Sequence, residues 1–194
     1  MPYGTAPISS KSQATCAECV ASRHVPSPHA DAYVPQAHEG FLKILKYQPS
    51  DADVLEQLRL IYLEMNEPIR ARILFQEAFD YCKANNPGAT EPSGNAEFGL
   101  LQIIALADFY NNAGEYRTAV SVVRQGARWL DGRLSECGMW DDFADDREFD
   151  VEGGIRDNYM PSQIHTLDVN LRHRLAVSRL RLGELAEAEV RFRC

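Results

Sequence analysis

Hydrophobic side chains recur every three or four residues over most of the chain after residue 37, which is the spacing of a buried helix face. Three stretches carry this pattern most clearly, at residues 52–79, 100–127 and 171–192. Each stretch has a Gly or an Asn near its middle, where a first helix would end and a second would begin. The pattern therefore predicts an all-α protein built from consecutive helix pairs.

The helix pairs share one register. Small residues stand where two helices must approach closely, and Ala37 lies 34 residues before Ala71. A 34-residue unit of two antiparallel helices resembles the tetratricopeptide repeat, which stacks into a solenoid. A generic helical bundle is the alternative explanation. The small residues at the close approach are Ala71, Ala119 and Ala188, and the residues expected to take a positive φ are Asn66, Gly114 and Gly183.

The composition divides the chain into four parts. Residues 1–33 are rich in Ser, Pro, Ala and His and are expected to form a disordered tail. Residues 34–131 are expected to hold the second half of one repeat and two full repeats, with a Pro/Gly insertion at 86–99. Residues 132–168 form an acidic linker or insertion, and residues 169–194 a truncated repeat.

The net charge of −8 is concentrated in one segment, because residues 131–152 hold nine acidic residues and two arginines. The rest of the chain is close to neutral, so direct binding to a phosphate backbone, which needs a basic face, is not expected. No apolar run approaches the length of about 20 residues that crosses a bilayer, and the first residues do not form a signal peptide. Five scattered cysteines favour a reducing compartment.

Within residues 131–152 stands the run WDDFADDREFD at residues 140–150, which we call the acidic segment. A flexible charged loop does not shift carboxylate pKa values as acid–base catalysis requires, and the spacing is not that of a calcium-binding EF-hand loop. Aromatic residues set among the acidic ones are typical of segments that dock onto a basic, partly apolar surface. A solvated loop and a brace for the helix array are the alternatives. The candidate docking residues are Trp140, Asp141, Asp142, Phe143, Asp145, Asp146 and Phe149.

A second candidate site lies in the tail, where Cys16, Cys19, His24 and His29 have nearly the spacing of a zinc knuckle. Such a site would bind tetrahedral zinc and single-stranded nucleic acid. The intervening residues lack the glycines and aromatics typical of a knuckle, so a disordered tail without metal or cofactor is the preferred interpretation.

The first helix of each pair should line a concave groove. Acidic and apolar residues stand there in place of the basic clamp that chaperone-binding repeats use, so an extended or helical peptide with apolar anchors is the expected ligand. No nucleotide-binding or hydrolase motif occurs in the chain, which is therefore not expected to be an enzyme. The expected groove residues are Leu60, Leu63, Leu101, Ile104, Asp108, Asn111 and Asn112.

Four stretches together carry a resemblance to a known family. They are KYQPSDADVLEQLRLIYLEMNEPIRARILFQEAF, ARWLDGR, WDDFADDREFD and LDVNLRHRLAVSRLRLGELAEAEVRF. In this combination the chain from residue 37 to residue 194 resembles the tetratricopeptide subunit of the fungal RNA polymerase III factor TFIIIC, whose own chain is much longer.

The resemblance implies a nuclear, non-enzymatic scaffold in a promoter-bound complex. Its expected partners are other TFIIIC subunits and components of the initiation factor TFIIIB, with DNA contacted only indirectly and no membrane or small-molecule substrate. Two alternatives from the residues stay open: a repeat adaptor in RNA processing or complex assembly, and a nucleic-acid binder that acts through the zinc-knuckle candidate.

Overall fold

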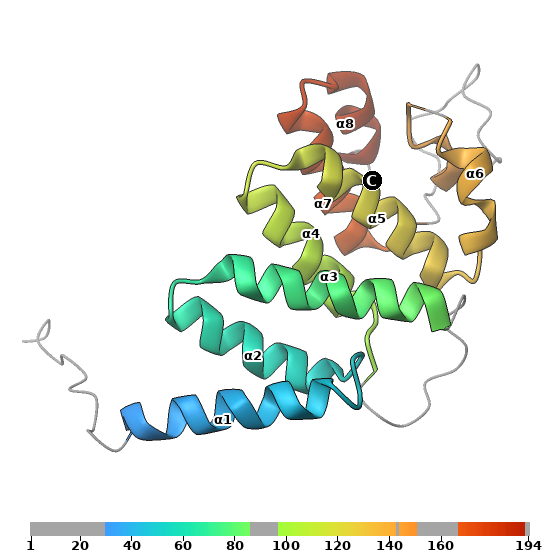
Figure 1. Cartoon of the computed structure of the whole chain (residues 1–194). Helices are drawn as coiled ribbons and strands as arrows, with labels where there is room; N and C mark the ends of the chain where they lie inside the picture. The colour runs from blue at the N-terminus through green and yellow to red at the C-terminus, as the bar shows by residue number, and fades with distance from the viewer. Residues whose placement is uncertain (1–29, 86–96, 143, 151–166, 193–194) are drawn as a thin grey trace, which may run out of the picture.

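The computed structural model describes residues 30–85, 97–142, 144–150 and 167–192. These residues form eight α-helices, shown in Figure 1. The helices are α1 (Ala30–Leu45), α2 (Ala52–Glu64), α3 (Pro68–Asn85), α4 (Leu100–Asn112), α5 (Tyr116–Leu130), α6 (Cys137–Trp140), α7 (Val169–Arg181) and α8 (Leu185–Phe192). Of two short 3₁₀ turns, η1 (Leu134–Glu136) precedes the acidic run and η2 (Arg147–Phe149) lies within it. The all-α prediction is confirmed, and the arrangement is consistent with a tetratricopeptide-like solenoid.

The long helices pack as the pairs α2–α3, α4–α5 and α7–α8, joined by three turns of the same design. Asn66, Gly114 and Gly183 have φ values of 56°, 78° and 79°, as the sequence predicts for residues that follow a first helix. In each turn the next residue donates its backbone N–H to a carbonyl five residues earlier, at distances of 2.7 to 3.0 Å. Such a bond satisfies a carbonyl that the helix end leaves unpaired.

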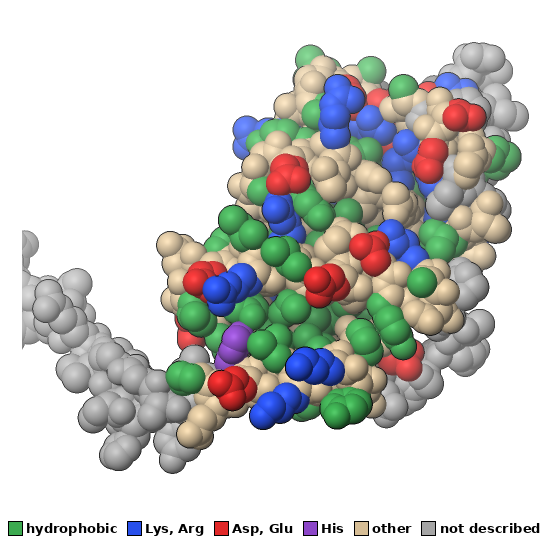
Figure 2. All heavy atoms as spheres, viewed as in Figure 1, with side chains coloured by type: hydrophobic (Ala, Val, Ile, Leu, Met, Phe, Trp, Pro, Cys, Tyr) green, Lys and Arg blue, Asp and Glu red, His purple; other side chains and the backbone are tan. Residues whose placement is uncertain are grey.

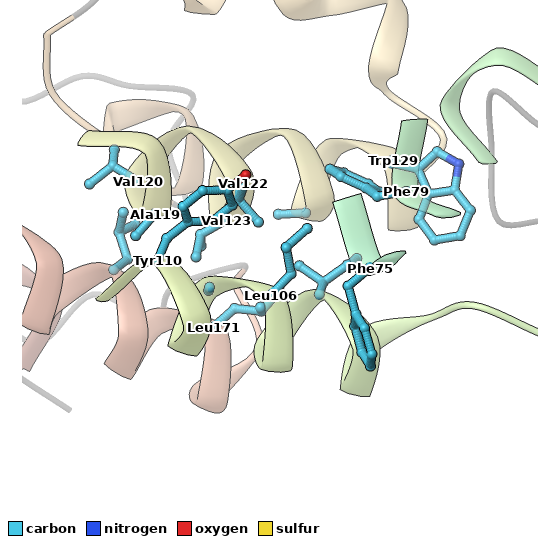
Figure 3. Packing of buried hydrophobic residues seen from close by; sticks show 14 of the residues in the cluster. Phe75, Phe79, Leu106, Tyr110, Ala119, Val120, Val122, Val123, Trp129 and Leu171 are labelled. Carbon is cyan, nitrogen blue, oxygen red and sulfur yellow. The ribbon is translucent and has the colours of Figure 1, made fainter. Parts of the chain in front are cut away.

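The core runs between the helix pairs and is built from the positions that the pattern selects (Figure 3). Ala71, Ala119 and Ala188 are almost fully buried, which fits their expected place between closely packed helices. Gly126 lies so close to α4 that a Cβ atom there would come within 2.5 Å of Ile103 Cγ2. The closest approach of α5 to α4 therefore depends on a residue without a side chain.

Two regions differ from the expected organisation. Helix α1 begins at Ala30, inside the stretch expected to be disordered, and includes Pro35. Phe98, from the expected insertion at 86–99, is buried and stacks on Phe79 with ring centroids 5.7 Å apart. Its backbone N–H also donates to Ser50 O at 2.9 Å, which holds the start of α4 against the start of α2. The end of the insertion is thus part of the core.

Among the described residues, no helix combines the length and the apolar character that a membrane-spanning segment needs.

Candidate functional site

A groove of about 1080 Å³ lies between α2 and α4 and is closed at one end by the start of α3. We call it the α2–α4 groove. It follows α2 from Ala52 to Leu63 and α4 from Leu101 to Ala113, with Ile69 and Arg72 of α3 at the far end. The two helices start side by side because Asp51 and Glu97 form a β-bridge. The groove therefore runs along almost the whole length of both helices.

The two walls of the groove differ in polarity. The α2 wall presents Asp53, Glu56 and Arg59, and the Arg59 guanidinium makes two hydrogen bonds to the Glu56 carboxylate. These bonds hold the pKa of Glu56 below its usual value and raise the pKa of Arg59. The α4 wall presents the apolar side chains of Leu101, Ile104, Ala105 and Phe109. The groove thus offers one polar and one apolar wall.

Most of the residues expected to form the groove do line it. Leu101 is 72% exposed and Leu63 is 43% exposed, so both offer apolar surface to a ligand. Asp108 faces the groove but accepts hydrogen bonds from the Arg174 guanidinium of α7 at 3.0 and 3.1 Å. Ile104 and Asn112 also line the groove, whereas Leu60 and Asn111 do not. Ser178 donates a hydrogen bond to the Asn111 side chain.

The second part of the site is the acidic segment, residues 140–150. Glu148 is buried and binds two arginines of α5. Arg124 Nε and Arg128 Nε each donate to a different Glu148 oxygen at 2.7 Å, and Arg128 Nη2 donates to the first of these oxygens at 2.9 Å. The carboxylate therefore neutralises part of the charge that two buried guanidinium groups carry.

The other two buried acids of the segment bind the last helix pair. Arg179 of α7 donates to both oxygens of Asp146, at 2.5 and 2.9 Å. Burial alone would lower the pKa of Arg179, but the hydrogen bonds and charges of Asp146 and Glu184 together outweigh it and raise the pKa. Arg191 of α8 donates to Asp150 Oδ1 at 2.9 Å and to the Asp146 carbonyl at 2.6 Å. Figure 2 shows basic and acidic side chains side by side in this region, between α8 and α6.

The alternation of the acidic residues explains these contacts. Residues 146, 148 and 150 are two apart, and each carboxylate reaches a different helix: α7, α5 and α8 respectively. Arg124, Arg128, Arg179 and Arg191 are all buried, so each guanidinium needs a paired carboxylate to offset its desolvation. The acidic segment therefore holds the last two helix pairs together.

Two candidate docking residues of this segment lie inside the protein. Asp146 is buried against Arg179, and Phe149 is buried in the main core cluster. In this structure neither faces solvent, because the inward side of the segment is occupied by ion pairs and apolar packing. The sequence left docking and bracing of the helix array open for this run, and the burial of these two residues agrees with the bracing alternative.

The outward side of the segment stays accessible. Asp142 is exposed, and the Asp141 side chain is 54% exposed while it accepts a hydrogen bond from Arg128 Nη1 at 2.9 Å. Trp140 is half-buried and its carbonyl accepts from Arg124, while Asp145 binds Arg147. Phe143 lies outside the described residues. Exposed residues of the segment are thus accessible to a partner protein. That they dock onto one stays a prediction.

We compared the chain with known proteins to test the family resemblance that the sequence suggests. No protein-family model matches the chain. The chain is 32% identical over 163 residues to "Transcription factor tau subunit sfc4" of Schizosaccharomyces pombe (strain 972 / ATCC 24843), and the match covers 81% of this chain. The resemblance to a TFIIIC subunit is confirmed. The matched region is 16% of the relative's length, so this chain corresponds to a small part of the TFIIIC subunit.

The buried arginines are the residues that sequence reasoning missed in this TFIIIC-related chain. Arg179 stands four residues before its helix-ending glycine, the place that Tyr62 and Tyr110 occupy in the other two pairs. The sequence therefore did carry a signal for Arg179, because an arginine occupies a repeat position where the other two helix pairs have a buried tyrosine. Arg124, Arg128 and Arg191 likewise fall on buried faces of their helices.

The zinc-knuckle candidate Cys16, Cys19, His24 and His29 lies outside the described residues. Among the residues that are described, no group of three or more His, Cys, Asp or Glu side chains is placed to hold a metal ion.

Proposed function

We propose that this chain is a non-enzymatic protein-interaction scaffold in RNA polymerase III transcription initiation, where it helps a promoter-bound factor recruit the initiation factor. The observation that carries this proposal is the similarity to a transcription factor tau subunit over most of the chain. That relative is a transcription factor subunit rather than an enzyme, and its role supports a nuclear location for this chain.

The structure supports a scaffold in two ways. The α2–α4 groove presents a long, partly apolar surface of the kind that peptide segments of partner proteins occupy. The ion pairs of the acidic segment fix the last helix pair to the rest of the array, so that surfaces on different pairs keep a fixed relation. The expected partners are other TFIIIC subunits and TFIIIB components. Contact with DNA would be indirect, because the chain carries a net charge of −8.

Affinity purification of the tagged chain from nuclear extract, with the bound proteins identified by mass spectrometry, tests this function. We expect TFIIIC and TFIIIB subunits to co-purify. Exposed Asp142 gives a variant for the docking prediction, since changing it to Asn leaves the described ion pairs of the segment intact. Recovery of RNA-processing or assembly factors instead would favour the adaptor alternative. A folded chain that recovers no polymerase III factor would contradict the proposal.

A further inference from the structure

We propose that the α2–α4 groove binds an amphipathic α-helix of a partner protein, about three turns long, with apolar side chains along α4 and a Lys or Arg beside Asp53. The inference rests on the proposed scaffold function and specifies the ligand of its groove. It chooses between the extended and helical peptides that the sequence left open.

The dimensions of the groove accommodate a helix of about three turns. The lining from Ala52 to Leu63 spans 11 helical steps, or about 17 Å at 1.5 Å per residue. A single extended strand of that length occupies about 800 Å³, taking spacings of about 4.8 and 10 Å to its neighbours. A helix of that length and about 10 Å in diameter occupies about 1300 Å³. A groove of about 1080 Å³ is of the same order as the helix volume, so it accommodates a helix of this length with one edge in solvent.

The distribution of polarity sets which faces of the ligand helix meet which wall. The apolar α4 wall suits a stripe of apolar side chains spaced three and four residues apart. Leu63 and Ile69 continue this apolar surface at the end of the groove near α3. The α2 wall stays polar along its first two turns. An amphipathic helix matches both walls at once, whereas a wholly apolar or wholly polar helix matches only one.

The charges in the groove predict a basic residue on the ligand. Glu56 is paired with Arg59, Arg72 with Glu115, and Asp108 with Arg174. Asp53 is the charged lining residue that has no hydrogen-bond or ion-pair partner among the described residues. It is exposed in the first turn of α2, beside Ala52 at the end of the groove where α2 and α4 begin. A Lys or Arg on the ligand would complete the pairing of charges along the groove.

The experiment is selection of binders to the full chain from a displayed library of random peptides long enough for three to four helical turns. We expect the enriched peptides to share apolar positions spaced three and four residues apart and a Lys or Arg near one end. Leu101→Glu should lower the affinity of a selected peptide at least about tenfold, since it removes an exposed apolar contact. When the Asp53→Lys variant is the target of the same selection, the enriched peptides should carry Asp or Glu at the position of the basic residue.

Two controls keep the test decisive. Leu185→Glu changes a leucine that is 64% exposed on α8, and Glu77→Lys reverses an exposed acid on α3; neither residue lines the groove. Both variants should bind the selected peptides as the parent chain does. The proposal is overturned if nothing is enriched, if the binders lack helical periodicity or contain internal prolines, or if Leu101→Glu has no more effect than Leu185→Glu. TFIIIB subunits that still co-purify with a folded Leu101→Glu chain would retain the scaffold function and reject only its assignment to this groove.

Discussion

The carboxylate of Glu148 is the point at which the acidic segment can be tested most sharply. Glu148→Gln keeps the size of the side chain but removes its charge. The amide would also point N–H donors at the Arg124 and Arg128 guanidinium groups, which are themselves donors only. We expect this single substitution to loosen the acidic segment from α5 and to lower the stability of the array.

The magnitude follows from burial. The side chains of Glu148 and Arg128 are both 0% exposed, so water cannot solvate the guanidinium charge once the Glu148 carboxylate is removed. Removing one partner of a buried ion pair typically costs about 3–5 kcal/mol, because an uncompensated charge stays buried. For a protein of this size, each kcal/mol lowers the melting temperature by about 2–4 °C. Glu148→Gln is therefore expected to lower the melting temperature by about 6–20 °C.

The assay is thermal unfolding followed by far-UV circular dichroism. Asp142→Asn is the matched control, since it removes one charge from the same run at an exposed position without a described partner. It should leave the melting temperature nearly unchanged. Glu148→Asp, which keeps the charge on a shorter side chain, should give an intermediate loss.

Equal melting temperatures for Glu148→Gln and Asp142→Asn would refute this reasoning. They would mean that the acidic run is solvated in solution and that the arginine contacts do not stabilise the array.

Three further predictions concern the core. Gly126→Ala should cost about 1–3 kcal/mol by overpacking, since its Cβ would lie 2.5 Å from Ile103 Cγ2. Gly40→Ala, in open space on α1, should instead gain up to about 1 kcal/mol in urea unfolding, and equal effects would contradict the packing. Ala119→Leu should also cost about 1–3 kcal/mol, and an unchanged melting temperature would contradict a close helix pair. Burial raises the pKa of the Cys82 thiol from 9.0 to about 11, so its contribution to stability is complete below about pH 9 and is lost towards pH 11. Native Cys82 should therefore resist alkylation at pH 9 in peptide mapping, and Cys82→Ala should reduce the loss of stability above pH 9; rapid alkylation of the folded chain would contradict this.

The helix pairs could be predicted because their signals are local. Asn66, Gly114 and Gly183 mark the turns through a backbone conformation that few other residues adopt, and all three have the predicted positive φ. The start of α7 at Val169 follows Asp168, whose side chain accepts the N–H groups of Asn170 and Leu171. Such features depend on neighbours within a few residues, so a single sequence carries them.

The sequence could not decide whether the acidic segment docks a partner or braces the array, because the arginines that it binds are distant in sequence. Asp146 meets Arg179 across 33 residues, and Asp150 meets Arg191 across 41. A run of acidic residues has the same composition whether water solvates its carboxylates or arginine side chains pair with them. Phe98 escaped prediction for a similar reason. Its stacking on Phe79 of α3, with ring centroids 5.7 Å apart, reaches the preceding helix pair, while its local sequence is that of a loop.

We propose that this chain binds the polymerase III initiation machinery directly as a scaffold. Titration of the purified chain into fluorescently labelled, purified TFIIIB subunits, followed by anisotropy, measures this most directly. We expect the folded chain to bind at least one subunit saturably. A chain with a cooperative melting transition that binds none of the subunits would contradict it.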